Sequence, residues 1–172
     1  SMKDVPTILP NGIVQAAVLK RANHKDILVH KGLDFLNTEG IVATGSLRRK
    51  AQWLNRYPLH EVVGLRGNVN TRLKKLEDNT WNAAIFAAAG LERLNILPEN
   101  CTELHWMIPA PAQGVMMVVA KDSDEYCLEA LSSLNHKTTE ICAQVERDFL
   151  KELEGGCTAP IGALACIEND LL

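Results

Sequence analysis

The sequence predicts an α/β fold with a mostly parallel sheet. In the middle of the chain, a short apolar run rich in Val, Ile and Ala is followed three times by a segment whose apolar residues have helical spacing. Strands that alternate with helices in this way are typical of parallel sheets with helices on their faces. At 172 residues, the chain has room for one large domain or two small ones.

The three strand–helix repeats follow one another directly. The expected pairs are a strand at 41–43 with a helix at 46–57, a strand at 61–63 with a helix at 68–78, and a strand at 83–86 with a short helix at 88–94. Ser46 and Asn68 stand where the first two helices should begin. Both residue types cap helix N-termini by accepting a backbone N–H, so both are expected to be N-caps.

The other elements are less regular. Strands are expected at 13–19, 27–30, 102–108, 115–120 and 161–167, and helices at 123–134 and 138–153. The run 115–120 is apolar throughout, which favours a strand buried on both faces. Pro109 and Pro111 interrupt regular structure just before it.

Charge is unevenly distributed along the chain. The net charge is −3, but residues 44–93 hold nine Lys/Arg against four Asp/Glu, and residues 121–172 hold four against eleven. The middle of the chain should therefore attract anions. Aromatic residues make up only 5% of the sequence, which argues against a nucleic-acid partner because such proteins use aromatic stacking beside their basic residues.

Membrane, disulfide and metal classes receive no support from the sequence. No apolar run reaches the ~20 residues that cross a bilayer. The five cysteines form no CxxC pair, and the five histidines lack metal-ligand spacing. We expect a soluble, cytoplasmic protein with reduced thiols, no metal and no membrane partner.

Arginines follow the predicted strand ends. The positions are Arg48, Arg49, Arg66, Arg72 and Arg93. Cations in the first turn of a helix are disfavoured by roughly 0.3–1 kcal/mol each, unless an anion binds there. Ligands of open α/β sheets bind at the carboxyl ends of the strands, so the arginines predict a cleft for a ligand with several carboxylates or phosphates. The alternative is a solvated basic face on which each arginine pairs with a surface carboxylate.

Five segments, in this order, resemble the motifs of the porphobilinogen deaminase (hydroxymethylbilane synthase) family. They are Ser1-Met2-Lys3-Asp4-Val5-Pro6-Thr7, Thr44-Gly45-Ser46-Leu47-Arg48-Arg49, Leu65-Arg66-Gly67-Asn68-Val69-Asn70-Thr71-Arg72-Leu73, Ala89-Gly90-Leu91-Glu92-Arg93-Leu94 and Leu153-Glu154-Gly155-Gly156-Cys157. The family motif has serine where this chain has Gly45. One hydroxyl donor is therefore missing at that position.

The resemblance implies a three-domain enzyme whose first two domains are lobes like those of periplasmic binding proteins, with the active site between them. Residues 1–21 and 115–134 would belong to domain one, 22–108 to domain two, 109–114 to a hinge, and 135–172 to the start of a small α+β third domain. The start of domain one and most of domain three would lie outside the chain.

The resemblance also implies a role in tetrapyrrole (haem) biosynthesis. Members of the family condense four porphobilinogen molecules into hydroxymethylbilane on a dipyrromethane cofactor, which a cysteine holds as a thioether. The matching residue is Cys157. Without the resemblance, this cysteine would be interpreted as structural.

The resemblance gives roles to further residues. Asp4 would be catalytic by stabilising the cationic intermediate that remains after ammonia leaves. From its surroundings alone, Asp4 would be an ordinary turn aspartate. Cofactor-binding residues would be Lys3, Thr44, Gly45, Ser46, Arg48, Arg49, Arg66 and Asn68, and substrate-binding residues would be Arg72 and Arg93.

Other functions remain open at the level of sequence. The main alternative is a non-catalytic module that binds a small polyanion in the same arginine-lined cleft, and Cys157 distinguishes the two because a pure binder needs no covalent primer. A structural or nucleic-acid-binding role is disfavoured by the acidic C-terminal part. We expect a monomer, and we expect the 172-residue chain alone to turn over porphobilinogen poorly or not at all.

Overall fold

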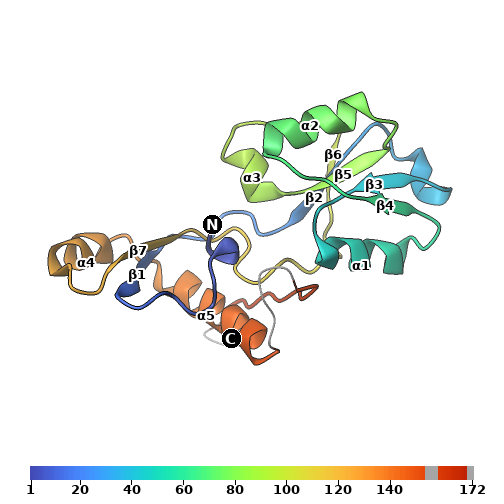
Figure 1. Ribbon diagram of the computed structural model, residues 1–172. Helices are drawn as coiled ribbons and strands as arrows, with labels where there is room; N and C mark the ends of the chain where they lie inside the picture. Colours follow the sequence, from blue (N-terminus) through green and yellow to red (C-terminus); the bar gives the residue numbers. More distant parts are fainter. Residues whose placement is uncertain (154–158, 170–172) are drawn as a thin grey trace. The chain divides into compact units, whose positions relative to one another are not determined.

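The computed structural model describes residues 1–153 and 159–169. The chain divides into two compact units (Figure 1). Unit 1 combines Ser1–His24 with Pro109–Leu172, and unit 2 is Lys25–Ile108. The three-domain division expected from the sequence stays a prediction.

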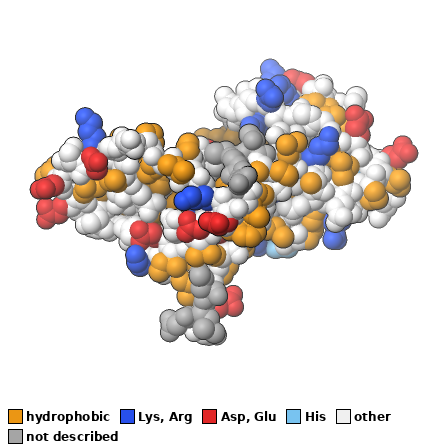
Figure 2. Space-filling model, turned by 60° about the horizontal axis from the view of Figure 1, so that its bottom comes forward, with side chains coloured by type: hydrophobic (Ala, Val, Ile, Leu, Met, Phe, Trp, Pro, Cys, Tyr) orange, Lys and Arg blue, Asp and Glu red, His pale blue; other side chains and the backbone are white. Residues whose placement is uncertain are grey.

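The surface has a mixed character. On the face drawn in Figure 2, acidic and basic side chains are interspersed with apolar ones. Some large apolar side chains are well exposed, among them Leu59 at 73% and Tyr126 at 81%. Within the described part of the chain, no helix is both long and apolar enough to cross a membrane.

Unit 2 is built on a five-stranded mixed sheet. Its strands are β2 (Asp26–His30), β3 (Ile41–Ala43), β4 (Glu61–Val63), β5 (Ala83–Ala87) and β6 (Cys101–Glu103), in the order β4-β3-β5-β2-β6. Strand β3 pairs in parallel with β4 and β5, whereas β2 runs antiparallel to both β5 and β6. The predicted α/β class is confirmed, and the strand–helix repeats supply the parallel part of the sheet.

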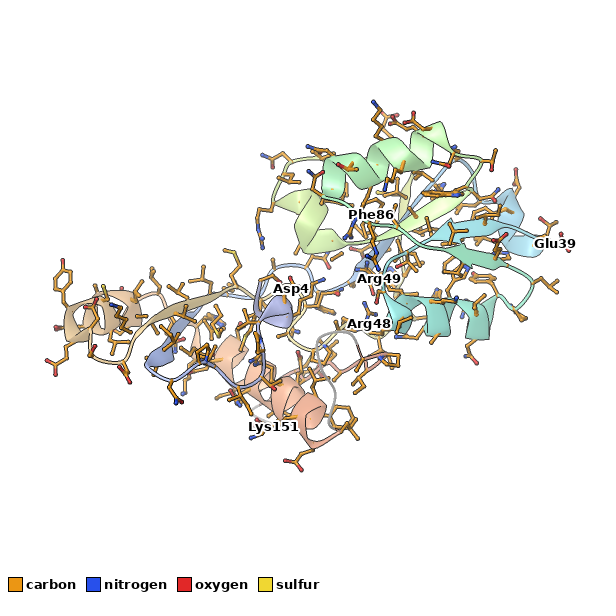
Figure 3. All side chains as sticks on the ribbon, viewed as in Figure 1. Asp4, Glu39, Arg48, Arg49, Phe86 and Lys151 are labelled. Atoms are coloured by element: carbon orange, nitrogen blue, oxygen red, sulfur yellow. The ribbon has the colours of Figure 1, made fainter. Side chains whose placement is uncertain are left out.

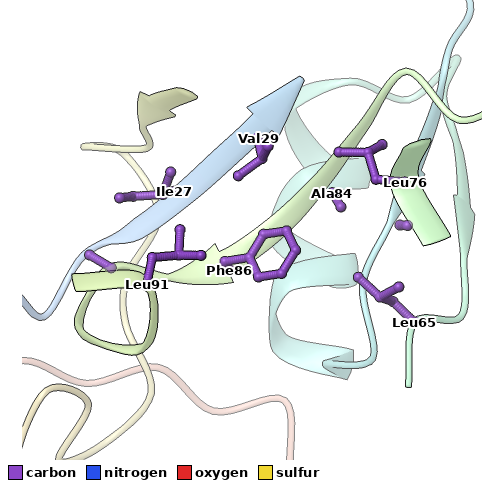
Figure 4. Close-up of a cluster of buried hydrophobic side chains, with 9 residues drawn as sticks. Ile27, Val29, Leu65, Leu76, Ala84, Phe86 and Leu91 are labelled. Carbon is purple, nitrogen blue, oxygen red and sulfur yellow. The ribbon is translucent and has the colours of Figure 1, made fainter. Parts of the chain in front are cut away.

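Helices cover both faces of this sheet. They are α1 (Leu47–Arg56), α2 (Val69–Asp78) and α3 (Ala88–Glu92), and a 3₁₀ turn, η2 (Asp34–Asn37), follows β2. Successive strand residues point to opposite faces. Leu28 and Ile85 therefore pack with Trp53 of α1. Phe86 packs on the other face with Leu76 of α2 (Figure 4). Unit 2 thus has three layers, with an apolar core on each side of the sheet.

In its described residues, unit 1 contains a short two-stranded sheet, two helices and one 3₁₀ turn. The elements are η1 (Met2–Asp4), β1 (Ile13–Val18), β7 (Met117–Lys121), α4 (Glu125–Ser132) and α5 (Lys137–Glu152). Strands β1 and β7 pair antiparallel. The prediction of a strand buried on both faces at 115–120 is wrong, because β7 has only one neighbour and Val119 is 45% exposed.

The strand predicted at 161–167 is also wrong. The structure describes these residues as irregular. Their backbone groups bind partners outside any sheet, since the N–H of Ala163 donates to the Pro109 carbonyl and that of Ala165 to the Glu146 carboxylate. This apolar run is therefore irregular because its backbone donors bind a buried carboxylate and a loop carbonyl, not a neighbouring strand.

Candidate functional site

The candidate site of unit 2 lies at the carboxyl edge of its parallel strands. Because β3 and β4 are parallel, the loops that follow them leave the sheet at the same edge. The Ser46 hydroxyl accepts from the backbone N–H of Arg49 at 3.4 Å, and the Asn68 side chain accepts from that of Thr71 at 2.9 Å. Both predicted N-caps are confirmed, so the loops end in fixed helix starts.

Arg48 and Arg49 point from the first turn of α1 into unit 2 (Figure 3). Both are buried, with 3% and 6% of their surface exposed. Arg48 Nη1 lies 2.8 Å from one carboxylate oxygen of Asp26. Arg49 donates from Nε at 3.0 Å and from Nη2 at 2.7 Å to the other oxygen. Asp26 is fully buried, so two guanidinium groups share one buried carboxylate.

The guanidinium groups also reach the main chain around them. Arg49 Nη1 donates to the Ile85 carbonyl of β5 at 3.1 Å, and Arg48 Nη1 donates to the Ile108 carbonyl. The cluster therefore joins the start of α1 to strands β2 and β5 and to the end of unit 2. The sequence predicted guanidinium groups open to a ligand, and the structure places these two inside the unit.

Asp26 was not foreseen as part of the site. It begins β2, and its register partner is Ala87 at the end of β5, because the two strands are antiparallel. The first residue of an antiparallel strand thus lies at the same edge as the last residues of the parallel strands. An acidic residue directly before the apolar run 27–30 was the available signal in the sequence.

The cluster leaves an excess of positive charge below the α1 N-terminus. Two guanidinium groups against one carboxylate give +1. Burial lowers the pKa of Arg48, and the Asp26 carboxylate opposes that shift through charge attraction and a hydrogen bond. The uncompensated charge adds to the partial positive charge of the helix N-terminus, so this edge favours an anion.

A pocket opens at the same edge. Its lining comes from the ends of β3 and β4 and from the first turn of α1: Thr44, Gly45, Ser46, Leu47, Lys50, Val62, Val63, Gly64, Leu65 and Arg66. Lys50 and Arg66 are exposed, and no residue in the described part of the chain pairs with either side chain. Arg66 was expected from the sequence, whereas Lys50, which follows Ser46 by one helical turn, was not.

The pocket's size fits a small acidic group. Its volume is about 220 Å³. Sites that enclose a drug-sized ligand measure about 300–1,000 Å³. Two cations, the Ser46 hydroxyl and the Thr44 side chain thus surround a space suited to a carboxylate-bearing arm rather than to a whole large ligand.

The other two predicted arginines lie beyond the pocket lining. Arg72 is half-buried on α2, and its Nε donates to the Gly67 carbonyl at 2.7 Å. Arg93 is exposed and follows α3 directly. The structure therefore places Arg66 at the pocket, Arg72 in the following helix turn and Arg93 after the next strand.

Unit 1 holds the remaining predicted residues. Lys3 and Asp4 lie in η1, where Lys3 is half-buried and Asp4 is exposed. None of the described residues forms a hydrogen bond with the Asp4 carboxylate. Cys157 falls outside the described residues. The other four cysteines are free thiols, and the described residues bring together no group of three His, Cys, Asp or Glu able to hold a metal ion.

Most of the chain matches the models of one protein family. Residues 1–129 match the family model described as "Porphobilinogen deaminase, dipyromethane cofactor binding domain". The chain belongs to the porphobilinogen deaminase family. Residues 140–172 match that family's C-terminal domain model. The resemblance seen in the motifs is confirmed, and so is the dipyrromethane cofactor as the ligand class of the matched domain.

Curated relatives agree over nearly the whole chain. Porphobilinogen deaminase of Chloroherpeton thalassium is 43% identical over 175 residues, covering 98% of this chain and 55% of the relative. The chloroplastic porphobilinogen deaminase of Oryza sativa is 42% identical over 176 residues, covering 99% of this chain and 49% of the relative. The chain spans about half the length of the curated relatives it matches.

The chain also has a weak likeness to solved structures. An amino acid ABC transporter substrate-binding protein from Streptococcus pneumoniae matches at 17% identity with a TM-score of 0.39, covering 78% of this chain and 59% of that chain.

Replacing Asp26 should destabilise unit 2. We expect Asp26→Asn to lower the free energy of unfolding by about 3–5 kcal/mol, because it leaves two buried guanidinium groups without their shared carboxylate. All three tryptophans lie in unit 2, so urea unfolding followed by tryptophan fluorescence reports on this unit. The control is the exposed Asp34, whose change to Asn should stay within about 0.5 kcal/mol. Equal midpoints for the two variants would contradict the assigned role of Asp26.

Gly45 should resist the serine that the family motif carries. A Cβ at this position would lie 2.5 Å from the Leu65 carbonyl oxygen, so the two loops at the pocket would have to separate. We expect Gly45→Ser to cost about 1–3 kcal/mol of stability. Gly64→Ala is the matched control, since a Cβ there meets nothing within 4 Å. If the same unfolding assay finds Gly45→Ser as stable as the wild type, the close approach does not constrain this loop.

Proposed function

We propose that the protein carrying this chain acts in tetrapyrrole biosynthesis as a hydroxymethylbilane synthase, a transferase. It would join four porphobilinogen molecules head to tail, with loss of one ammonia from each. Family membership supports this proposal, and the named relatives are porphobilinogen deaminases. Because the chain spans only part of their length, the activity belongs to the complete protein.

The observation that carries the proposal is the pair of exposed cations at the pocket. Lys50 and Arg66 face the carboxyl edge of the sheet beside the Ser46 hydroxyl. Each porphobilinogen unit bears an acetate and a propionate, and these carboxylates are the groups that a lysine, an arginine fork and a helix N-terminus bind well. Among the described residues, the pocket lining includes no acidic side chain that would repel an anion.

The donor set fits the dipyrromethane cofactor. When bound, this group supplies the pyrrole carbon to which the first substrate ring is joined. Its acidic side chains would be held at the edge of unit 2 by Thr44, Gly45, Ser46, Arg66 and Asn68. Lys50, which also lines the pocket, would bind them too. Lys3 would contribute a further positive charge from unit 1, and Cys157 would form the thioether.

The sequence suggested that Arg48 and Arg49 bind ligand carboxylates directly, and we propose a different role for them. Their guanidinium groups are held by Asp26, so we propose that they serve the cofactor mainly through charge and position. They hold the first turn of α1, which Ser46 caps, and they leave a net charge of +1 below it. Arg72 and Arg93 would bind the carboxylates of incoming substrate, for which the exposed position of Arg93 is suitable.

Asp4 would perform the chemistry. Loss of ammonia from porphobilinogen leaves a cation whose charge resides partly on the pyrrole nitrogen. A fixed carboxylate aimed at that nitrogen stabilises the developing charge, and it can assist proton transfer to the departing amine. The exposed Asp4 carboxylate, with no hydrogen bond from the described residues, is available for this role.

We further propose that the protein is a cytoplasmic monomer that acts on a small molecule and binds neither nucleic acid nor membrane. The four described cysteines are free thiols, which suits a reducing compartment. On the face in Figure 2, charges of both signs are interspersed, whereas nucleic-acid binding favours a continuous basic surface.

Neutralising either pocket cation should weaken binding of the cofactor. We expect Lys50→Met and Arg66→Met each to slow cofactor loading of the apoenzyme about tenfold or more, since a charge-assisted hydrogen bond contributes about 1.5–3 kcal/mol. The rate at which porphobilinogen converts apoenzyme to holoenzyme, followed by intact mass spectrometry, measures this effect. Lys74→Met is the control, because Lys74 is exposed on α2 and does not line the pocket. An equal change in all three variants would refute a specific role for the pocket.

Cys157 should carry a covalent adduct. Intact mass spectrometry of the complete protein, purified as the holoenzyme, should show an added mass equal to two linked pyrroles. The adduct should be lost in Cys157→Ser and retained in Cys166→Ser, a control at an exposed cysteine. Active protein with an unmodified mass would overturn the cofactor assignment.

A further inference from the structure

Helix α5 carries two adjacent buried charges that the proposed chemistry does not use. Glu146 is 1% exposed and Arg147 is 7% exposed. Charged side chains are rarely buried to this degree unless partners hold them. Their contacts therefore show which parts of unit 1 the helix fixes.

Arg147 binds the turn that contains Asp4. Its Nη1 donates to the carbonyl of Met2 at 3.1 Å and to that of Val5 at 3.0 Å, and its Nη2 donates to the carbonyl of Pro6 at 2.5 Å. The three acceptors stand on both sides of Asp4 in the chain. One guanidinium, 141 or more residues away in sequence, thus gathers the main chain around this residue.

A second contact within unit 1 holds the same turn. The N–H of Met2 donates to the Val115 carbonyl at 2.9 Å, and Met2 itself is buried. Local bonds from the N–H of Asp4 to Ser1 and from that of Val5 to Met2 close the turn. The backbone is therefore fixed from two directions, while the Asp4 carboxylate stays exposed.

We propose that Arg147 is a positioning residue that sets the location of the Asp4 carboxylate. The inference rests on the proposed function, in which Asp4 stabilises the cation formed from porphobilinogen. A planar guanidinium presents five donors in a fixed fork and can serve three carbonyls at once. A lysine ammonium keeps the charge but lacks this geometry, so Arg147→Lys should loosen the turn without removing the charge.

The ion pair between Glu146 and Arg21 provides a matched control for Arg147. Glu146 accepts two bonds from Arg21, at 2.7 and 2.8 Å, and one from the N–H of Ala112 at 2.6 Å. This network holds residues 21, 112 and 165, and among the described residues Glu146 makes no hydrogen bond to residues 2–6. Arg21→Lys therefore disturbs a partly buried arginine of unit 1 while leaving the hydrogen bonds of the Asp4 turn in place.

Kinetics of the holoenzyme test the proposal. We expect Arg147→Lys to lower kcat by about 10- to 100-fold with KM little changed, because small misplacements of a catalytic group cost rate rather than binding. Arg21→Lys should keep kcat near the wild-type value even if its melting temperature falls as much. Equal losses of kcat in both variants would overturn the positioning role.

A double-mutant cycle separates positioning from general damage. If Arg147 acts through Asp4, then Arg147→Lys should cause little further loss of single-turnover rate when Asp4→Asn is already present. If Arg147→Lys lowers the single-turnover rate as much in the Asp4→Asn background as in the wild type, Arg147 does not act through Asp4 and the proposal is refuted.

Hydrogen exchange supplies a readout that needs neither activity nor a folded variant. In the wild-type protein, the amides of Met2 and Val5 should be protected to about the level of the α5 backbone. Exchange at the rate of an unfolded chain would refute the anchored turn. Protected amides in a protein that makes no hydroxymethylbilane would instead refute the proposed function and leave the anchor standing.

Discussion

The buried carboxylate of Asp26 is the interaction on which the unit 2 site depends. It holds Arg48 and Arg49 at the start of α1, and these arginines in turn bind the middle of β5 and the end of the unit. A carboxylate removed from water is costly unless it is paired, and here two guanidinium groups form ion pairs with it. The pairing leaves a positive charge below a capped helix N-terminus, beside the pocket that Lys50 and Arg66 line.

A buried charge fixes the chain beside an exposed functional group in each unit. In unit 2, the Asp26 cluster fixes the loop after β3, while Lys50 and Arg66 remain free for a ligand. In unit 1, Arg147 fixes the turn around Asp4 and leaves the carboxylate exposed. This division fits a site that must grip many carboxylates, since rigid support reduces the entropy cost of binding, and unpaired exposed groups supply the contacts.

Sequence patterns predicted the local structure of unit 2 well but not the partners of its arginines. Ser46 and Asn68 could be recognised as caps because capping depends on residues within one helical turn. The burial of Arg48 depends on Asp26, 22 positions away, which reaches the site only because β2 runs antiparallel to β5. The strand expected at 161–167 failed for a related reason: the distant Glu146 carboxylate binds the Ala165 N–H, and local propensity carries no information on such a contact. Roles of Asp4 and Cys157 came from motifs alone.

A crystal structure of the cofactor-loaded protein would test the central claim most directly. We predict that carboxylates of the dipyrromethane lie within hydrogen-bond distance of Ser46, Lys50 or Arg66, while Arg48 and Arg49 remain bound to Asp26. Cofactor carboxylates found far from the carboxyl edge of β3 and β4, or Asp26 displaced from both arginines by the cofactor, would contradict it.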